Sequence, residues 1–367
     1  MKSLSSLHVT LLGPDIDHRR SLEAMLAGRV AQVGWVPDSH SFQHGRPASP
    51  VDRLSRAADQ LFGTRDAAYL AEVLSSIDQA DTDVLICYWG TTPLADLRAL
   101  KRRRPQLKII LMVLCYPVAL EAWGVRRQRW MMRRAACCLD GVLYSNQTMA
   151  AYFDQQVWSG RCRPRSSMVV PPCWPVDYQQ AVQLESVGLE PNIIFAGRTD
   201  LSHHTVHAAD DLRPLMNDIL SAGIHLHHVR SHETADGHPF RHPFEPMSQA
   251  DLIRQMSAHD ASLIAYNTAA CARPDRFSLT VPDRLITSVA AGVPIAIPSR
   301  GYEGAKDYLR HYPAVFEFDS ASHLSTLLCD RPRVQSLRQA AWRARSQYSA
   351  EHQGSLLADY LGRCVAA

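Results

Sequence analysis

The feature that most constrains this chain is a repeated alternation of short apolar runs with segments of helical spacing. In the first half, the apolar runs lie at residues 8–13, 30–36, 83–89, 108–115 and 141–145. Helical segments lie between or after them, at residues 19–27, 67–80, 126–138 and 148–156. Strands that are apolar along most of their length are typical of a parallel sheet covered by helices on both faces. Because βαβ connections are right-handed, this pattern predicts a doubly wound α/β domain.

The same pattern begins again in the second half. Apolar runs lie at residues 192–196, 224–229, 261–266 and 293–297, and helices are expected at 208–221, 248–258, 283–291, 321–328 and 333–350. A polar loop is expected from residue 230 to Pro246. The second half is therefore predicted to be another α/β domain of similar size.

The two halves are joined by a segment that cannot belong to a regular element. Residues 171–175 read PPCWP, and three prolines in five residues exclude a helix interior or a central strand. We therefore expect a first domain at residues 1–170, a linker at 171–190 and a second domain at 191–345. A C-terminal helix at 346–367 is expected to cross back to the first domain.

The composition excludes several classes of protein. The chain has 39 basic and 36 acidic residues, a net charge of +3, which excludes a nucleic-acid binder that depends on a large positive excess. Nine cysteines without a CxxC spacing favour reduced thiols in a cytoplasmic protein. The longest apolar stretch, residues 109–118, is shorter than the roughly 20 residues needed to cross a bilayer.

The segment with the most specific chemistry is residues 281–298 (VPDRLITSVAAGVPIAIP). The pattern predicts a helix that begins after Pro282 and ends at Gly292, followed by a buried strand. A helix N-terminus presents free N–H groups and positive dipole to an anion. Arg284, in the first turn, adds a forked cation that suits a phosphate group.

These residues resemble the nucleotide-sugar site of GT-B glycosyltransferases, of the family 4-like or group 1 type. Pro282, Arg284 and Leu285 match the start of a motif in those enzymes, with Arg in place of Lys, and residues 290–294 (AAGVP) match its end. Residues 192–198 (NIIFAGR) resemble the strand that ends in a Gly-Arg pair beside the donor pyrophosphate. The chain departs from the family because Leu279 and Thr287 occupy the positions of its paired glutamates.

The resemblance implies two Rossmann-like doubly wound domains that face each other across a cleft. It implies transfer of a sugar from a nucleotide-diphosphate donor, held by the second domain, to a glycan, lipid-linked or protein acceptor on the first. It also implies chemistry that requires no metal or other cofactor. The residues implied at the donor are Gly197, Arg198, His203, His204, Tyr266, Pro282, Asp283, Arg284, Leu285 and Thr287.

On the acceptor side, the sequence Gly13-Pro14-Asp15 ends the first strand, and ligands of doubly wound sheets bind at the carboxyl ends of strands. Asp15, Asp17 and His18 are therefore candidates for catalysis, although a solvated acidic turn has the same pattern. The residues predicted to line the acceptor site are Gly13, Pro14, Tyr88, Trp89 and Tyr116. Aromatic side chains at these strand ends are equally typical of packing.

Two further clusters have less specific patterns. The second half is rich in histidine, but its spacings match no metal site, so we predict that no metal binds there. The segment from Arg126 to Arg134 (RRQRWMMRR) is compatible with peripheral docking on an anionic membrane at its inner face. The interpretation we favour is a packed apolar stripe with arginines whose charged ends reach solvent.

Two alternatives to a glycosyltransferase remain open. A non-hydrolysing UDP-sugar 2-epimerase shares the architecture, but it would require acid and base carboxylates that we cannot identify in the sequence. A degenerate member of the fold would bind a nucleotide or a partner protein without turnover, and the absence of the paired glutamates allows that alternative.

Overall fold

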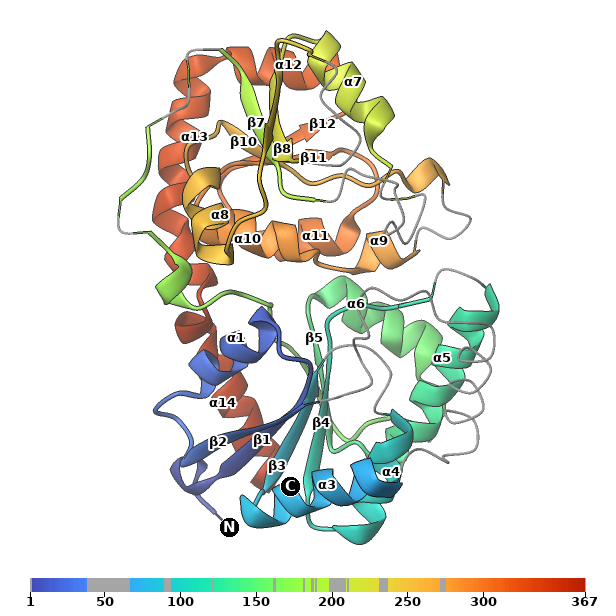
Figure 1. Ribbon diagram of the computed structural model, residues 1–367. Helices are drawn as coiled ribbons and strands as arrows, with labels where there is room; N and C mark the ends of the chain where they lie inside the picture. Colours follow the sequence, from blue (N-terminus) through green and yellow to red (C-terminus); the bar gives the residue numbers. More distant parts are fainter. Residues whose placement is uncertain are drawn as a thin grey trace. The chain divides into compact units, whose positions relative to one another are not determined.

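The computed structural model describes residues 2–366 with the exception of 38–66, 89–93, 120–121, 161–162, 181, 186–187, 189, 198–208, 210, 231–236 and 271–274. It divides into two compact units (Figure 1). Unit 1 comprises Met1–Pro172 and Gln353–Ala367, and unit 2 comprises Cys173–His352. Each unit contains a parallel sheet of six strands with helices on both faces, so the predicted fold class is confirmed.

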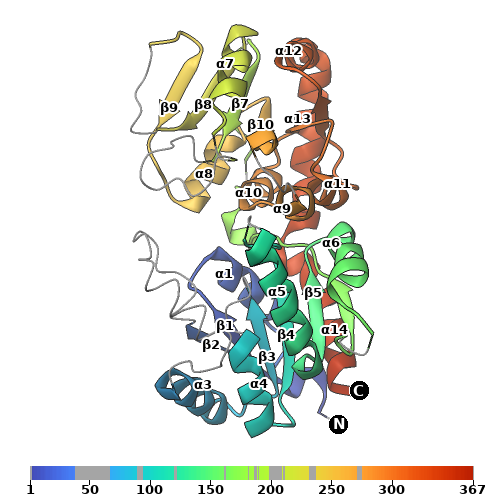
Figure 2. The ribbon, with the colours of Figure 1, turned by 90° about the vertical axis from the view of Figure 1, so that its right-hand side faces the viewer.

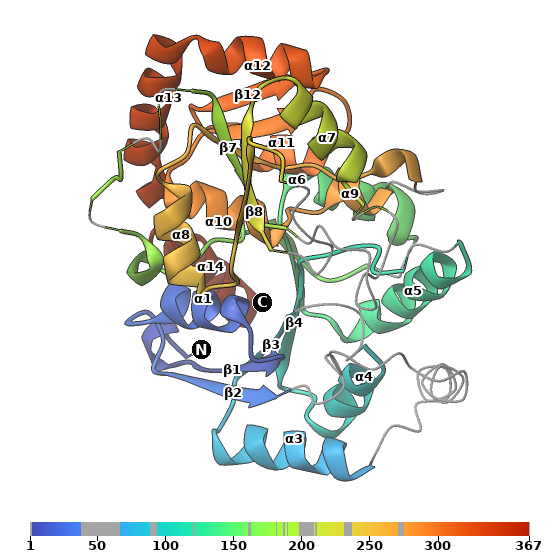
Figure 3. The same ribbon diagram turned by 45° about the horizontal axis from the view of Figure 1, so that its top comes forward.

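The sheet of unit 1 has the strand order β2-β1-β3-β4-β5-β6. Its strands are β1 His8–Gly13, β2 Gln32–Pro37, β3 Val84–Tyr88, β4 Lys108–Val113, β5 Gly141–Tyr144 and β6 Ser167–Val169. The helices are α1 Asp17–Leu26, α3 Ala67–Gln79, α4 Leu94–Arg103, α5 Ala122–Ala135, α6 Gln147–Tyr152 and α14 Ala350–Ala366. Helices α1 and α14 lie on one face of the sheet and α3 on the other (Figure 3).

The sheet of unit 2 has the order β12-β11-β10-β7-β8-β9. Its strands are β7 Asn192–Phe195, β8 His225–Val229, β9 Arg241–Phe244, β10 Ala261–Leu263, β11 Ile295–Pro298 and β12 Val315–Phe318. The helices are α7 Arg213–Ser221, α8 Gln249–Met256, α9 Asp275–Leu279, α10 Asp283–Ala291, α11 Glu303–Tyr308, α12 Ala321–Cys329 and α13 Arg331–Ala344.

Two apolar layers hold the sheet of unit 2 between its helices. On β7, Ile194 packs with residues of α8, α10 and α11, whereas Ile193 and Phe195 pack with residues of α7 and α12. This alternation follows from the period of two in a strand, which sends successive side chains to opposite faces. The burial of both faces is the reason that the strand sequence is apolar throughout.

Three strands of the two sheets begin after an aspartate that binds the backbone of the neighbouring strand. Asp83 accepts a hydrogen bond from the N–H of His8 at 3.0 Å. Asp140 and Asp260 accept in the same way from Ile109 and Asn192, each at 3.0 Å. These bonds satisfy N–H groups at the amino ends of the strands, where the ladder offers no partner.

The structure differs from the sequence prediction at the edge of unit 2. Residues 241–244 (RHPF) form β9 within the segment expected to be a loop, and Figure 2 shows β9 at the border of the sheet. An edge strand pairs on one side only and tolerates both polar residues and a proline. Its sequence therefore lacks the apolar pattern on which the prediction depended. Helices α9 and α11 and strand β12 were likewise not predicted.

Candidate functional site

Unit 2 has a topological switch point between β7 and β10. These strands are neighbours in the sheet, and from them the chain builds outward to β8 and β9 on one side and to β11 and β12 on the other. In open parallel sheets, the crevice for a ligand lies at the carboxyl ends of the strands at this point. The backbone at those ends is formed by Phe195 to Gly197 and by Ile264 to Tyr266.

The guanidinium of Arg284 lies at this switch point. Arg284 is the second residue of α10, which begins after the extended Pro282 (φ −73°, ψ 146°). Its Nη2 donates to the carbonyl oxygen of Ala265 at 2.8 Å, just beyond β10. Its Cζ lies 4.0 Å from the ring centroid of Tyr266 and 5.0 Å from that of Phe195. The arginine is therefore fixed over the ends of both central strands by a hydrogen bond and two cation–π contacts.

Gly197 provides the space that the guanidinium occupies. A β-carbon added at Gly197 would lie 2.5 Å from Nη1 of Arg284 and would also overlap the ring of Phe195. Among the residues that the structure describes, no carboxylate pairs with Arg284, and its buried Nε has no hydrogen-bond partner. A guanidinium with donors to spare at a switch point can bind an anion with two oxygens, such as a phosphate.

The loop that supports Arg284 is anchored by Tyr302, which the sequence analysis did not identify. The Tyr302 hydroxyl accepts a hydrogen bond from the N–H of Tyr266 at 2.7 Å and donates to the carbonyl oxygen of Tyr266 at 3.1 Å. Burial raises the pKa of Tyr302 to about 12, so the hydroxyl keeps its proton near neutral pH. The backbone of Tyr302 is left-handed (φ 63°). No sequence motif indicates the contact between Tyr302 and Tyr266.

Thr287 has a different role from the one that the resemblance implies. Its hydroxyl donates to the carbonyl oxygen of Asp283 at 2.9 Å and accepts from Trp174 Nε1 at 3.0 Å and Gln249 Nε2 at 2.5 Å. A hydroxyl has one donor and two acceptor positions, so all three are in use. The side chain is 2% exposed and joins α10 to α8 and to the chain at Trp174.

The remaining donor-side candidates divide into two groups. Pro282 and Leu285 are buried and position the start of α10, whereas Asp283 is exposed in its first turn. Arg198, His203 and His204 lie outside the described residues, as does Trp89 on the acceptor side.

In unit 1, the corresponding switch point lies between β1 and β3, where Gly13 and Tyr88 meet. The Tyr88 hydroxyl donates to the carbonyl oxygen of Pro14 at 2.5 Å, and Trp35 Nε1 donates to that of Gly13 at 3.0 Å. A β-carbon at Gly13 would lie 2.6 Å from the Tyr88 ring, so this corner requires glycine. Burial raises the pKa of Tyr88 above its ordinary value.

The acceptor-side candidates differ in exposure. Asp15 is exposed and its Oδ1 lies 2.9 Å from Nε of Arg19, whereas Asp17 begins α1 and His18 is only 3% exposed. Tyr116 is fully buried, with its ring centroid 4.6 Å from that of Phe153. The structure therefore leaves Asp15 accessible next to the switch point and places Tyr116 in the core.

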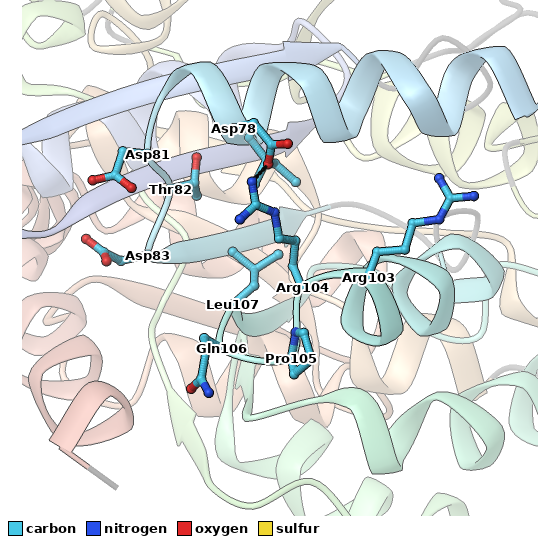
Figure 4. A pocket seen from close by; sticks show the side chains of 10 residues that line it. Asp78, Asp81, Thr82, Asp83, Arg103, Arg104, Pro105, Gln106 and Leu107 are labelled. Carbon is cyan, nitrogen blue, oxygen red and sulfur yellow. Dashed lines mark hydrogen bonds and ion pairs between the residues drawn. The ribbon is translucent and has the colours of Figure 1, made fainter.

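A cavity of about 330 Å³ lies at the opposite, amino-terminal edge of the unit 1 sheet (Figure 4). Its charged groups largely neutralise one another, because Asp78 pairs with Arg104 and Asp83 lies 2.7 Å from Nζ of Lys2. None of the predicted site residues lines it.

Among the described residues, no group of three or more His, Cys, Asp or Glu side chains is arranged to hold a metal ion. None of the described helices combines the length and the apolar character needed to span a membrane.

The pair of doubly wound parallel-sheet units defines the GT-B fold, and solved structures of that fold resemble this chain over nearly its whole length. Sucrose-phosphate synthase from Thermosynechococcus elongatus has a TM-score of 0.62 at 12% identity, covering 98% of this chain and 99% of that one. The Anabaena protein HepE, in complex with UDP and glucose, has a TM-score of 0.59 at 11% identity, covering 97% and 99%. A glycosyltransferase from Rickettsia africae has a TM-score of 0.59 at 9% identity, covering 98% and 99%.

Comparison by sequence alone finds no matching family model and no matching curated protein. The predicted GT-B fold is confirmed, and the structural neighbours include glycosyltransferases.

Proposed function

We propose that this protein is a glycosyltransferase that binds a nucleotide-diphosphate sugar at the Arg284 site of unit 2. The observation that carries the proposal is the position of the Arg284 guanidinium at the switch point, where Nη2 donates to Ala265 and no described residue accepts a hydrogen bond from Nη1. The Anabaena neighbour of the same fold is in complex with UDP-glucose, which supports a UDP-sugar as the donor.

The chemistry follows from the charge on the leaving diphosphate. When the bond from the sugar to the diphosphate breaks, negative charge grows on the phosphate oxygens and positive charge on the anomeric carbon. Arg284 donates to those oxygens, and the N-terminus of α10 adds positive dipole in the same direction. We propose that these groups stabilise the departing diphosphate without a metal ion.

The acceptor side of the proposal concerns the corner of unit 1. Asp15 follows β1 directly, and its side chain is 62% exposed even though it pairs with Arg19. Of the candidates Asp15, Asp17 and His18, we propose Asp15 as the group that contacts the acceptor hydroxyl, because it is the most accessible.

The seven cysteines in the described residues are free thiols, in keeping with the proposed cytoplasmic location.

Calorimetric titration with UDP and UDP-glucose tests the donor site. We expect the wild type to bind both, and Arg284→Ala to weaken binding about tenfold or more, because a charge-assisted, two-oxygen contact is lost. Arg310→Ala is a matched control, since Arg310 is an exposed arginine of the same unit that pairs with Asp307. Wild-type affinity in Arg284→Ala would overturn the site, and a wild type that binds no nucleotide sugar would overturn the function.

A degenerate, non-catalytic nucleotide binder is the second candidate. It is favoured by Leu279 and Thr287, which replace the glutamates of the family and are both buried. Incubation with radiolabelled UDP-glucose and a panel of sugar acceptors distinguishes the two. Tight nucleotide binding without any transfer or donor hydrolysis would support this second candidate against the first.

A further inference from the structure

Helix α5 has a solvent-facing side that neither the donor site nor the acceptor corner uses. Its buried side consists of Val125, Gln128, Met131, Met132 and Ala135. The opposite side exposes Trp123 (74%) and Trp130 (40%) together with Arg126 and Arg134. The favoured sequence interpretation is therefore wrong for Trp130, because the two methionines pack inward and the tryptophan does not. Residues 123, 126, 130 and 134 follow helical spacing along one stripe.

The charge of this face is positive throughout. Helix α5 as described contains five arginines and no acidic residue, and Glu121 just before it lies outside the described residues. Arg129 and Arg133 have internal roles, since they donate to the Tyr152 hydroxyl and to the carbonyl oxygen of Val157. The other three arginines are Arg126, Arg127 and Arg134, and none of them forms an ion pair with a described residue.

The neighbouring helix is also basic in its last turn, and one of these residues, Arg103, lines the cavity at the amino-terminal edge of the sheet. Helix α4 packs beside α5 (Figure 2), and its last turn contains the exposed residues Arg102 and Arg103. On α5 itself, Cζ of Arg134 lies 4.4 Å from the ring centroid of Trp130, so cationic and aromatic groups are mixed along the surface.

We infer that this face of α5 docks the protein on an anionic phospholipid bilayer. Tryptophan has an apolar ring with one N–H donor, and it accumulates at the boundary between headgroups and acyl chains. Arginine binds lipid phosphates through two parallel donors. A surface helix with one buried apolar side and an exposed side of Trp and Arg matches this location. The net charge of +3 argues against a nucleic-acid binder that depends on a large positive excess over the whole chain.

Vesicle co-sedimentation tests the inference on the full-length protein. We expect binding to vesicles of phosphatidylglycerol mixed with phosphatidylcholine, and little binding to phosphatidylcholine alone. The double variants Trp123→Ala/Trp130→Ala and Arg126→Glu/Arg134→Glu should each reduce binding about tenfold or more. Because these side chains are exposed, the thermal unfolding temperature and the titration with UDP-glucose should stay at wild-type values. Failure of vesicle binding would therefore leave the proposed glycosyltransferase function intact, and failure of nucleotide-sugar binding would leave the inferred membrane docking intact.

Val182→Ala is the matched control, because Val182 is an apolar residue of unit 2 that is 74% exposed, like Trp123. Three results would overturn the inference. The first is a wild type that binds both kinds of vesicle equally, or neither. The second is wild-type binding in the tryptophan variant. The third is binding to a single-stranded oligonucleotide in place of the anionic vesicles.

Discussion

Among single residues, Gly197 determines whether Arg284 can take its position at the switch point. Glycine is required there by close approach, because the added β-carbon would meet both the guanidinium and the Phe195 ring. Sequence alone identified Gly197 and Arg284 as separate members of two motifs. It could not show that the two residues adjoin, because they are 87 positions apart along the chain.

Gly197→Ala should displace the guanidinium and weaken UDP-glucose binding about tenfold, with a modest loss of stability. The measurement is calorimetric titration together with thermal unfolding. Gly34→Ala serves as the control, since a β-carbon at Gly34 would meet only Oγ1 of Thr10 at 3.5 Å, an ordinary contact. Unchanged affinity in the Gly197 variant would show that the arginine does not depend on this space.

At the scale of elements, Thr287 joins three parts of unit 2 through one hydroxyl. The resemblance to GT-B glycosyltransferases drew attention to this position, because it implies a glutamate there. The structure shows Trp174, Gln249 and the backbone of Asp283 around it, none of which a local pattern indicates.

Thr287→Val keeps the shape of the side chain and removes all three hydrogen bonds. Because the Trp174 N–H is then left buried without its partner, we expect a loss of about 1–3 kcal/mol in the free energy of unfolding. Urea denaturation measures the loss, and Thr326→Val is the control at an exposed helical position. UDP affinity should not change. If affinity falls while stability is retained, Thr287 contacts the ligand after all.

At the scale of the whole molecule, one source of pH-dependent stability is a group of histidines that pack against one another in unit 2. His227 has its ring centroid 4.6 Å from that of His242 and 4.5 Å from that of His259. His225 Nδ1 lies 2.8 Å from His242 Nε2. Burial lowers the pKa of His227 to about 3 and that of His259 to about 4. The sequence showed a histidine-rich second half but did not single out His259, which lies outside β8 and β9 and meets His227 only in the folded unit.

The lowered pKa values predict that acid destabilises the protein. The unfolded chain binds protons below about pH 6.5, whereas folded His227 and His259 stay neutral until pH 3–4. The contribution of these two histidines is therefore complete above about pH 6.5 and falls below it, by at most about 1.4 kcal/mol per pH unit for His259 and by less for the partly exposed His227. The thermal unfolding temperature should drop between pH 7 and pH 5, and His227→Phe should make the drop shallower. An equal drop in the unfolding temperature of the wild type and of His227→Phe would show that His227 does not contribute to the acid sensitivity.

By itself, the sequence determined the fold class and the ends of the central elements. Strands buried on both faces must be apolar throughout, and Pro282 and Gly292 begin and end α10 for local steric reasons. Only the tertiary structure decided which side chains meet: Arg284 with Tyr266 and Phe195, β9 with β8, and Trp123 with solvent. A local pattern predicts which residues of a segment are buried. Which distant segments contact one another depends on the strand order and on the crossovers between strands, and no single segment contains that information.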